Sequence, residues 1–233
     1  MLKIRLVVVA FITLTLTACG SIDWIDFVQF NGIHYIAVDY FGGAAGRDLV
    51  EADLGPEFAR VKNKYAETYL FFIPKCCRDG DAAYLDKGTP VYIVKDYNPE
   101  FRLAAYRDDR LVLYEVDTNP KAQTGADLLD IGGKVRYIGV VSAQDGVTEL
   151  ATITDPEQVA VLVELVLGAP VDQTRLTQVG IQSYFIAFHL SDDTIVSRTY
   201  SPDSDELSRG IMLPEAFGTA VEQALLAAIP TPP

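Results

Sequence analysis

The pair Asn31-Gly32 is the local feature that most limits how this chain folds, because it lies between two short apolar runs. Asn-Gly readily takes the positive φ angles of a type I′ turn, which joins two antiparallel strands in a tight hairpin. Such a turn pairs Phe30 with Ile33 and gives the hairpin one apolar face. The segment 26–38 is therefore predicted to be a β-hairpin. The same register gives these further pairs: Val28 with Tyr35, and Gln29 with His34.

Other short segments show a similar pattern, with acidic or glycine residues between apolar or aromatic runs. Such residues favour turns, so we expect further hairpins at these positions. Most of the chain up to about residue 154 is accordingly predicted to form short strands. The turn segments are Arg78-Asp79-Gly80-Asp81, Arg107-Asp108-Asp109-Arg110 and Ser191-Asp192-Asp193-Thr194.

Two later segments carry helix signals. The first begins after Asp155, a favourable N-cap residue, with Pro156 at the first helical position, and it ends before Pro170. Residues 159–167 are apolar on nearly every side, which predicts a deeply buried helix. The second helix is expected from about residue 214 to 228, where apolar residues recur at helical spacing. Those residues are Phe217, Val221 and Leu225.

The first eighteen residues are organised like a secretion signal. Lys3 and Arg5 precede the apolar stretch 6–18, which ends in Leu16-Thr17-Ala18-Cys19. As a helix, those thirteen residues would span roughly 20 Å, against a hydrocarbon core of about 30 Å. The stretch is short for a membrane span and typical of the apolar part of a signal peptide.

Leu-x-Ala-Cys followed by Gly20 resembles the lipobox of bacterial lipoprotein precursors, and the resemblance covers residues 1–19. It implies a diacylglyceryl group on the thiol of Cys19, cleavage before this residue, and a lipid-anchored protein on the extracytoplasmic face of a cell membrane. An ordinary cleaved signal with an incidental cysteine is the alternative. The whole chain is similar to many extracytoplasmic lipoproteins, a class that implies no site residue beyond Cys19.

The charge of the chain limits its partners. Removing eighteen of the 233 residues leaves 215, and the loss of Lys3 and Arg5 changes the net charge from −13 to −15. Anionic headgroups repel such a body, so we expect the lipid alone to hold it at the membrane. A sequence pI near 4.5 argues against nucleic acid as a partner.

The fold class predicted from these patterns is α+β. A β-rich N-terminal region of antiparallel hairpins is followed by an α+β unit with two helices. We divide the chain into a signal peptide at 1–18, a β-rich region at 19–142 and an α+β region at 143–233. The loop-like stretch 119–125 is an alternative boundary, so one domain or two remain possible.

Few residues suggest chemistry, and each has a simpler interpretation. Cys76 and Cys77 form an adjacent pair that would make a strained, easily reduced disulfide or bind a soft metal. Two inert thiols on opposite strand faces are the simpler interpretation.

The histidines and the glycine-rich stretch give no clear site. His34 and His189 are too few for a three-histidine zinc site, and the glycine-rich stretch 42–46 lacks a phosphate-loop ending.

Paired carboxylates are the remaining candidates, since they serve glycoside hydrolysis or calcium binding. Turn chemistry selects acidic residues at hairpin tips anyway. The pairs are Asp79/Asp81, Asp108/Asp109, Asp192/Asp193 and Asp203/Asp205/Glu206.

We assign no catalytic or metal-ligating residue and no cofactor from the sequence. The expected function is a membrane-anchored extracytoplasmic lipoprotein that acts as a binding or interaction module of unknown ligand. The alternatives are an extracytoplasmic hydrolase that uses paired carboxylates, and a thiol or soft-metal protein that uses Cys76 and Cys77.

Overall fold

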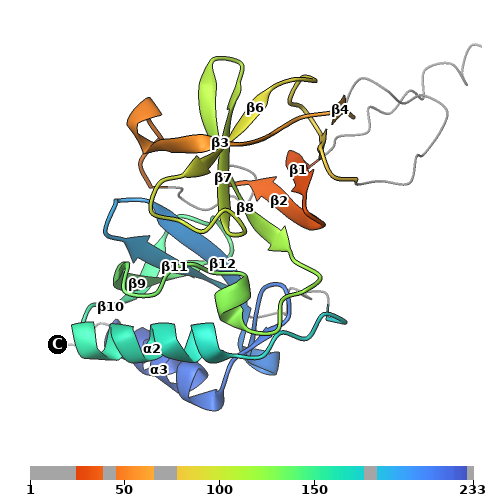
Figure 1. Cartoon of the computed structure of the whole chain (residues 1–233). Coiled ribbons are helices and arrows are strands. Elements are labelled where there is room, and N and C mark those ends of the chain that lie inside the picture. The colour runs from red at the N-terminus through yellow and green to blue at the C-terminus, as the bar shows by residue number, and fades with distance from the viewer. Residues whose placement is uncertain (1–24, 39–45, 66–77, 176–182, 230–233) are drawn as a thin grey trace, which may run out of the picture.

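Two β-sheets make up most of the computed structural model, which describes residues 25–38, 46–65, 78–175 and 183–229 (Figure 1). The first sheet has the strand order β3-β6-β7-β8-β2-β1-β5-β4. Its strands are β1 (Phe27–Phe30), β2 (Ile33–Ala37), β3 (Leu54–Arg60), β4 (Asn63–Lys64), β5 (Asp81–Ala82), β6 (Pro90–Val94), β7 (Arg102–Arg107) and β8 (Arg110–Thr118). Its neighbouring strands are antiparallel except for β4 and β5, which run parallel.

The second sheet is antiparallel and has the order β10-β9-β11-β12-β13-β14. The helices α2 (Pro156–Gly168) and α3 (Glu215–Ala227) cover one face of it, at the bottom of Figure 1. The α+β fold class is thereby confirmed. The strands are β9 (Val135–Ser142), β10 (Glu149–Ile153), β11 (Tyr184–Leu190), β12 (Ile195–Ser201), β13 (Glu206–Leu207) and β14 (Ile211–Met212). Short 3₁₀ segments also connect elements of the described chain: η2 (Glu51–Asp53), η3 (Gly125–Asp127) and η4 (Pro202–Ser204).

The predicted hairpins form where turn residues take positive φ angles. Asn31 and Gly32 have φ values of 54° and 78°, and the predicted pairs of β1 with β2 are all present. The turns at 107–110 and 191–194 likewise join β7 to β8 and β11 to β12. At 78–81 the chain enters β5, which pairs with β1 and β4; the residues just before this turn lie outside the described part.

The prediction of a deeply buried first helix was wrong on one side of α2. Its N-cap is as expected, because the Asp155 carboxylate accepts a hydrogen bond from the Gln158 amide at 2.8 Å. The helix lies on the outer side of the second sheet, so only one stripe of residues reaches the core. Val161 on the opposite side is 59% exposed. The buried residues are Val159, Leu162, Val163 and Val166.

A continuous hydrophobic core connects the two sheets. It runs from Tyr35 of β2 through Leu129 and Ile131 of the connection to Phe188 of β11 and Phe217 of α3. The strand β9 precedes the predicted boundary at 142/143, yet it pairs with β10 and β11, which follow that boundary. The division into a β-rich region and an α+β region stays a prediction, and so does the number of domains. Among the described residues, no helix is long and apolar enough to cross a bilayer.

A buried ion cluster also joins the sheets. The Glu115 carboxylate on β8 is 1% exposed and accepts hydrogen bonds from Arg102 Nε and Nη2 on β7, at 2.9 and 2.7 Å. Its other oxygen accepts a bond from Arg198 Nη1 on β12 at 2.8 Å. Arg102 reaches the second sheet as well, because its Nη1 donates to Thr194 Oγ1 at 2.9 Å. We call Arg102, Glu115 and Arg198 the ion clamp.

Substitution of Glu115→Gln is expected to lower the free energy of unfolding by about 3–5 kcal/mol, because it leaves two arginines buried without a counter-charge. Denaturant unfolding measures this. Glu57→Gln is the matched control, since the Glu57–Arg60 pair is exposed and its loss should cost less than about 1 kcal/mol. Equal losses in the two variants would contradict the role of the clamp.

Acid should weaken the same cluster. Burial alone would raise the pKa of Glu115, but Arg102 and Arg198 outweigh it and hold that pKa below its ordinary value of 4.5. A depressed folded-state pKa contributes stability above the unfolded pKa, and this contribution is lost as the pH falls. Stability should therefore decline below about pH 4.5, less steeply in Glu115→Gln than in the wild type.

Substitution of Gly218→Ala is expected to destabilise the contact of α3 with β12. A Cβ at this position would lie 2.7 Å from Tyr200 Oη and 3.0 Å from Asp205 Oδ1, two atoms that are hydrogen-bonded to each other. We expect a loss of about 1–3 kcal/mol in denaturant unfolding. Gly168→Ala at the end of α2 is the control, because a Cβ there meets nothing within 4 Å. A larger loss in the control would refute this packing argument.

Candidate functional site

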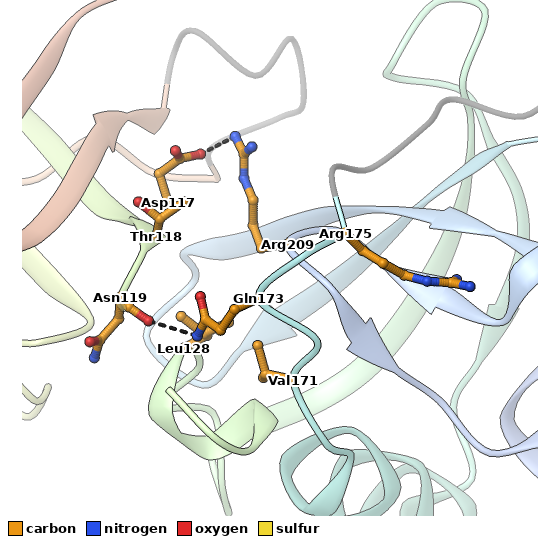
Figure 2. Close-up of a pocket in the computed structure, with 8 residues that line it drawn as sticks. All are labelled: Asp117, Thr118, Asn119, Leu128, Val171, Gln173, Arg175 and Arg209. Carbon is orange, nitrogen blue, oxygen red and sulfur yellow. Dashed lines mark hydrogen bonds and ion pairs between the residues drawn. The ribbon is translucent and has the colours of Figure 1, made fainter. Parts of the chain in front are cut away.

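A small pocket lies where the end of β8 faces the second half of the chain. Its volume is about 70 Å³, and we call it the inter-sheet pocket. Figure 2 shows its lining, which comes from β8, the segment after it, the segment after α2 and the turn between β13 and β14. The lining residues are Asp117, Thr118, Asn119, Leu128, Val171, Gln173, Arg175 and Arg209.

An ion pair lies at one side of the pocket. Asp117 lies two residues after Glu115 on β8, where the pairing with β2 is irregular, and is 7% exposed. Its carboxylate pairs with the Arg209 guanidinium and lies 3.3 Å from His34 Nδ1 on β2. Arg209 comes from the β13–β14 turn, where it has a φ of 72°. The pair thus connects the first sheet to the edge hairpin of the second.

Two hydrogen bonds fix the side-chain amide of Gln173. Its Nε2 donates to the main-chain oxygens of Asn119 and Ala122, at 3.0 and 2.9 Å. Both amide hydrogens are used, so Oε1 must point the other way. In Figure 2 this oxygen is on the side of the Asp117–Arg209 pair. The pocket therefore contains a preset hydrogen-bond acceptor.

The remaining lining is apolar on one side and charged at the rim. Leu128 and Val171 form a hydrocarbon wall. The Arg175 guanidinium points away from the other labelled residues in Figure 2 and lies 3.7 Å from Glu206 and 3.9 Å from Asp172. Its charge is thus directed out of the pocket.

Several residues considered in the sequence lie outside the described part of the chain. Cys19, Cys76 and Cys77 are among them, so lipidation of Cys19 and every thiol hypothesis stay predictions. Most of the glycine-rich stretch 42–46 is also outside it, with Gly46 at the edge of the described residues.

The described carboxylate pairs act in turns, as turn chemistry favours. Asp108, Asp109, Asp193 and Asp205 have positive φ angles. Asp192 accepts hydrogen bonds from the Thr194 amide and hydroxyl and from Tyr97 Oη, at 3.0, 2.7 and 2.8 Å.

The carboxylates of Asp79 and Asp81 also accept hydrogen bonds around the turn at 78–81. Asp79 accepts a hydrogen bond from the Gly32 amide at 2.8 Å, in the turn between β1 and β2. Asp81 accepts one from the Arg78 amide at 2.7 Å and another from Asn63 Nδ2 at 2.8 Å. Both carboxylates thus stabilise the chain where it enters β5.

A second concavity, of about 240 Å³, lies between the ends of β11 and β12, η4 and α3. Carboxylates and tyrosines line it, and Tyr200 Oη donates to Asp205 Oδ1 at 3.0 Å. Among the described residues, no three His, Cys, Asp or Glu side chains lie close enough to hold a metal ion. The polar lining residues include Tyr184, Tyr200, Asp205, Glu215, Thr219 and Glu222.

The two histidines of the chain lie in different environments. His34 is at the inter-sheet pocket through Asp117, whereas His189 stacks on Tyr137 with ring centroids 3.9 Å apart. Glu149 on β10 reaches over Gly139 of β9 to His189 Nε2 at 2.8 Å. A Cβ at Gly139 would lie 2.6 Å from the Glu149 oxygen, so glycine makes this contact possible.

No family model, curated protein or solved structure matches this chain. Its function is therefore inferred from the sequence and from the geometry of the described residues.

Most of the pocket residues carry no signal in the sequence. Asn119 stands out only as the start of a loop. Arg209 and Gly210 form a tight turn with φ values of 72° and 77°, but Arg-Gly is not a typical hairpin signal. The flanking strands β13 and β14 have two residues each, too few to show an alternating pattern.

Burial lowers the pKa of His189 below its ordinary value of 6.5, and Glu149 opposes this effect without cancelling it. Substitution of Glu149→Gln should therefore lower that pKa further. NMR titration of the two histidines measures the shift, with Glu157→Gln as a control at an exposed position of α2. A raised or unchanged pKa in Glu149→Gln would contradict the assignment of this pair.

Proposed function

We propose that this chain is a bacterial lipoprotein, anchored by a lipid on Cys19 to the extracytoplasmic face of a membrane, whose folded body is a binding module. The observation that carries the proposal is the sequence Leu16-Thr17-Ala18-Cys19 behind a basic start and an apolar stretch. Two or more acyl chains, each burying CH₂ groups at ~0.8 kcal/mol apiece, suffice for stable anchoring.

The start of the folded body supports a short tether. Seven residues separate Cys19 from the start of β1 at Phe27, and the eight steps from Cys19 to Phe27 span at most about 28 Å when fully extended. Asp26 is buried, pairs with Arg107 and accepts a hydrogen bond from Tyr114 Oη at 3.2 Å. Because these contacts fix Asp26 to the first sheet, the tether joins the folded body at that sheet.

The binding role is supported by the inter-sheet pocket. Polar groups from β8, the segment after α2 and the β13–β14 turn converge there beside an apolar wall, which is the usual composition of a small-ligand site. The Asp117–Arg209 pair joins β8 to the β13–β14 turn, and the Asp172 amide joins the segment after α2 to the same turn by donating to the Gly210 main-chain oxygen at 2.8 Å. The hydrolase and thiol alternatives stay predictions, and no described contact favours either over a binding module.

The lipid anchor is tested by mass spectrometry of the chain purified from a bacterial host. We expect a mature protein that begins at Cys19 and carries the mass of its acyl groups. An inhibitor of the lipoprotein signal peptidase should leave a heavier precursor.

Cys19→Ser is the matched variant, because it removes only the acylated sulfur and should release the protein from the membrane fraction. Cys76→Ser controls for loss of a thiol as such. A wild-type chain without added acyl mass, or one that begins at Met1, would overturn the proposal.

A further inference from the structure

We infer that the inter-sheet pocket binds the hydroxyl groups of a small neutral polyol or of a sugar unit; the inference rests on the proposed function as a binding module. Three features of the pocket carry it: the fixed orientation of Gln173, the pairing of the charges, and the size of the pocket.

Gln173 requires a hydrogen-bond donor in the ligand. Its Nε2 faces two main-chain carbonyl oxygens, those of Asn119 and Ala122. A flipped amide would set its own oxygen against both of them, which is unfavourable since neither can donate. Oε1 is thus held toward the pocket, where a hydroxyl group can donate to it (Figure 2).

The charges of the lining favour a neutral ligand. Asp117 is engaged by Arg209 and His34, and Arg175 is directed toward Asp172 and Glu206. A carboxylate or an amine would have to compete with one of these pairs within a confined space. A hydroxyl group accepts from a guanidinium and donates to a carboxylate, so it can lie beside the Asp117–Arg209 pair without separating it.

The size of the pocket limits how much of the ligand enters. Its volume of about 70 Å³ is less than a third of the volume of the concavity beside α3, which is about 240 Å³, so only a small part of a ligand can enter it. A two- or three-carbon hydroxylated fragment fits this space, with its C–H groups against Leu128 and Val171. The described lining contains no aromatic ring on which a sugar could stack, so we expect weak binding, on the order of 1–10 mM.

Saturation-transfer NMR on the full-length mature protein in detergent tests the inference. The probes are glycerol and a methyl glycoside, which distinguish a free polyol from a sugar unit, together with acetate and methylammonium. We expect saturable transfer to at least one hydroxylated probe and weaker or no transfer to the two ions.

Gln173→Met should weaken this binding about tenfold, because it removes the acceptor. Gln144→Met is the matched control at an exposed turn and should bind as the wild type does. Val171→Phe should block binding by filling the pocket while leaving Gln173 in place. Circular dichroism shows whether each variant is folded.

If acetate or methylammonium binds saturably and Val171→Phe abolishes that binding, the pocket is a binding site but the proposed ligand class is wrong. No saturable binding of either hydroxylated probe would overturn the inference as well. Neither result bears on the lipid anchor, whose failure is read from the mass of the mature protein.

Discussion

The buried carboxylate of Glu115 is the interaction on which the arrangement of this molecule depends. Glu115 on β8 is held by Arg102 of the neighbouring strand and by Arg198 of the other sheet. A buried carboxylate is stable only when its charge and its hydrogen bonds are satisfied, so the second sheet must lie where Arg198 can reach it. The ion clamp thereby restricts where β12 can lie relative to β8.

The candidate site follows from this restriction. Asp117 lies two residues after Glu115 on β8 and pairs with Arg209 of the β13–β14 turn. The segment after α2 then closes the other side with Gln173. The pocket is thus built by three parts of the chain, and the core through Leu129 and Ile131 supports it from within.

Local sequence patterns predicted individual hairpins and helices of this fold, whereas the pairing of distant segments could not be predicted from them. Asn31-Gly32 predicted its hairpin with the correct register, and Asp155 predicted the start of α2. No local signal could pair His34 with Thr118, because that contact joins distant segments. The site was missed for the same reason: apart from Asp117 and Thr118 at the end of β8, its residues lie in loops, where neither alternation nor helical spacing exists. A glutamate between Tyr114 and Val116 was a signal for a buried charge, although its partners could not be deduced from it.

Native-state hydrogen exchange in increasing denaturant tests most directly whether the clamp makes the two sheets one cooperative unit. The structure predicts that amides of β8 and β12 exchange through the same global unfolding, with equal free energies of opening. Exchange of β12 through a separate, lower-energy opening that leaves β8 protected would contradict this account.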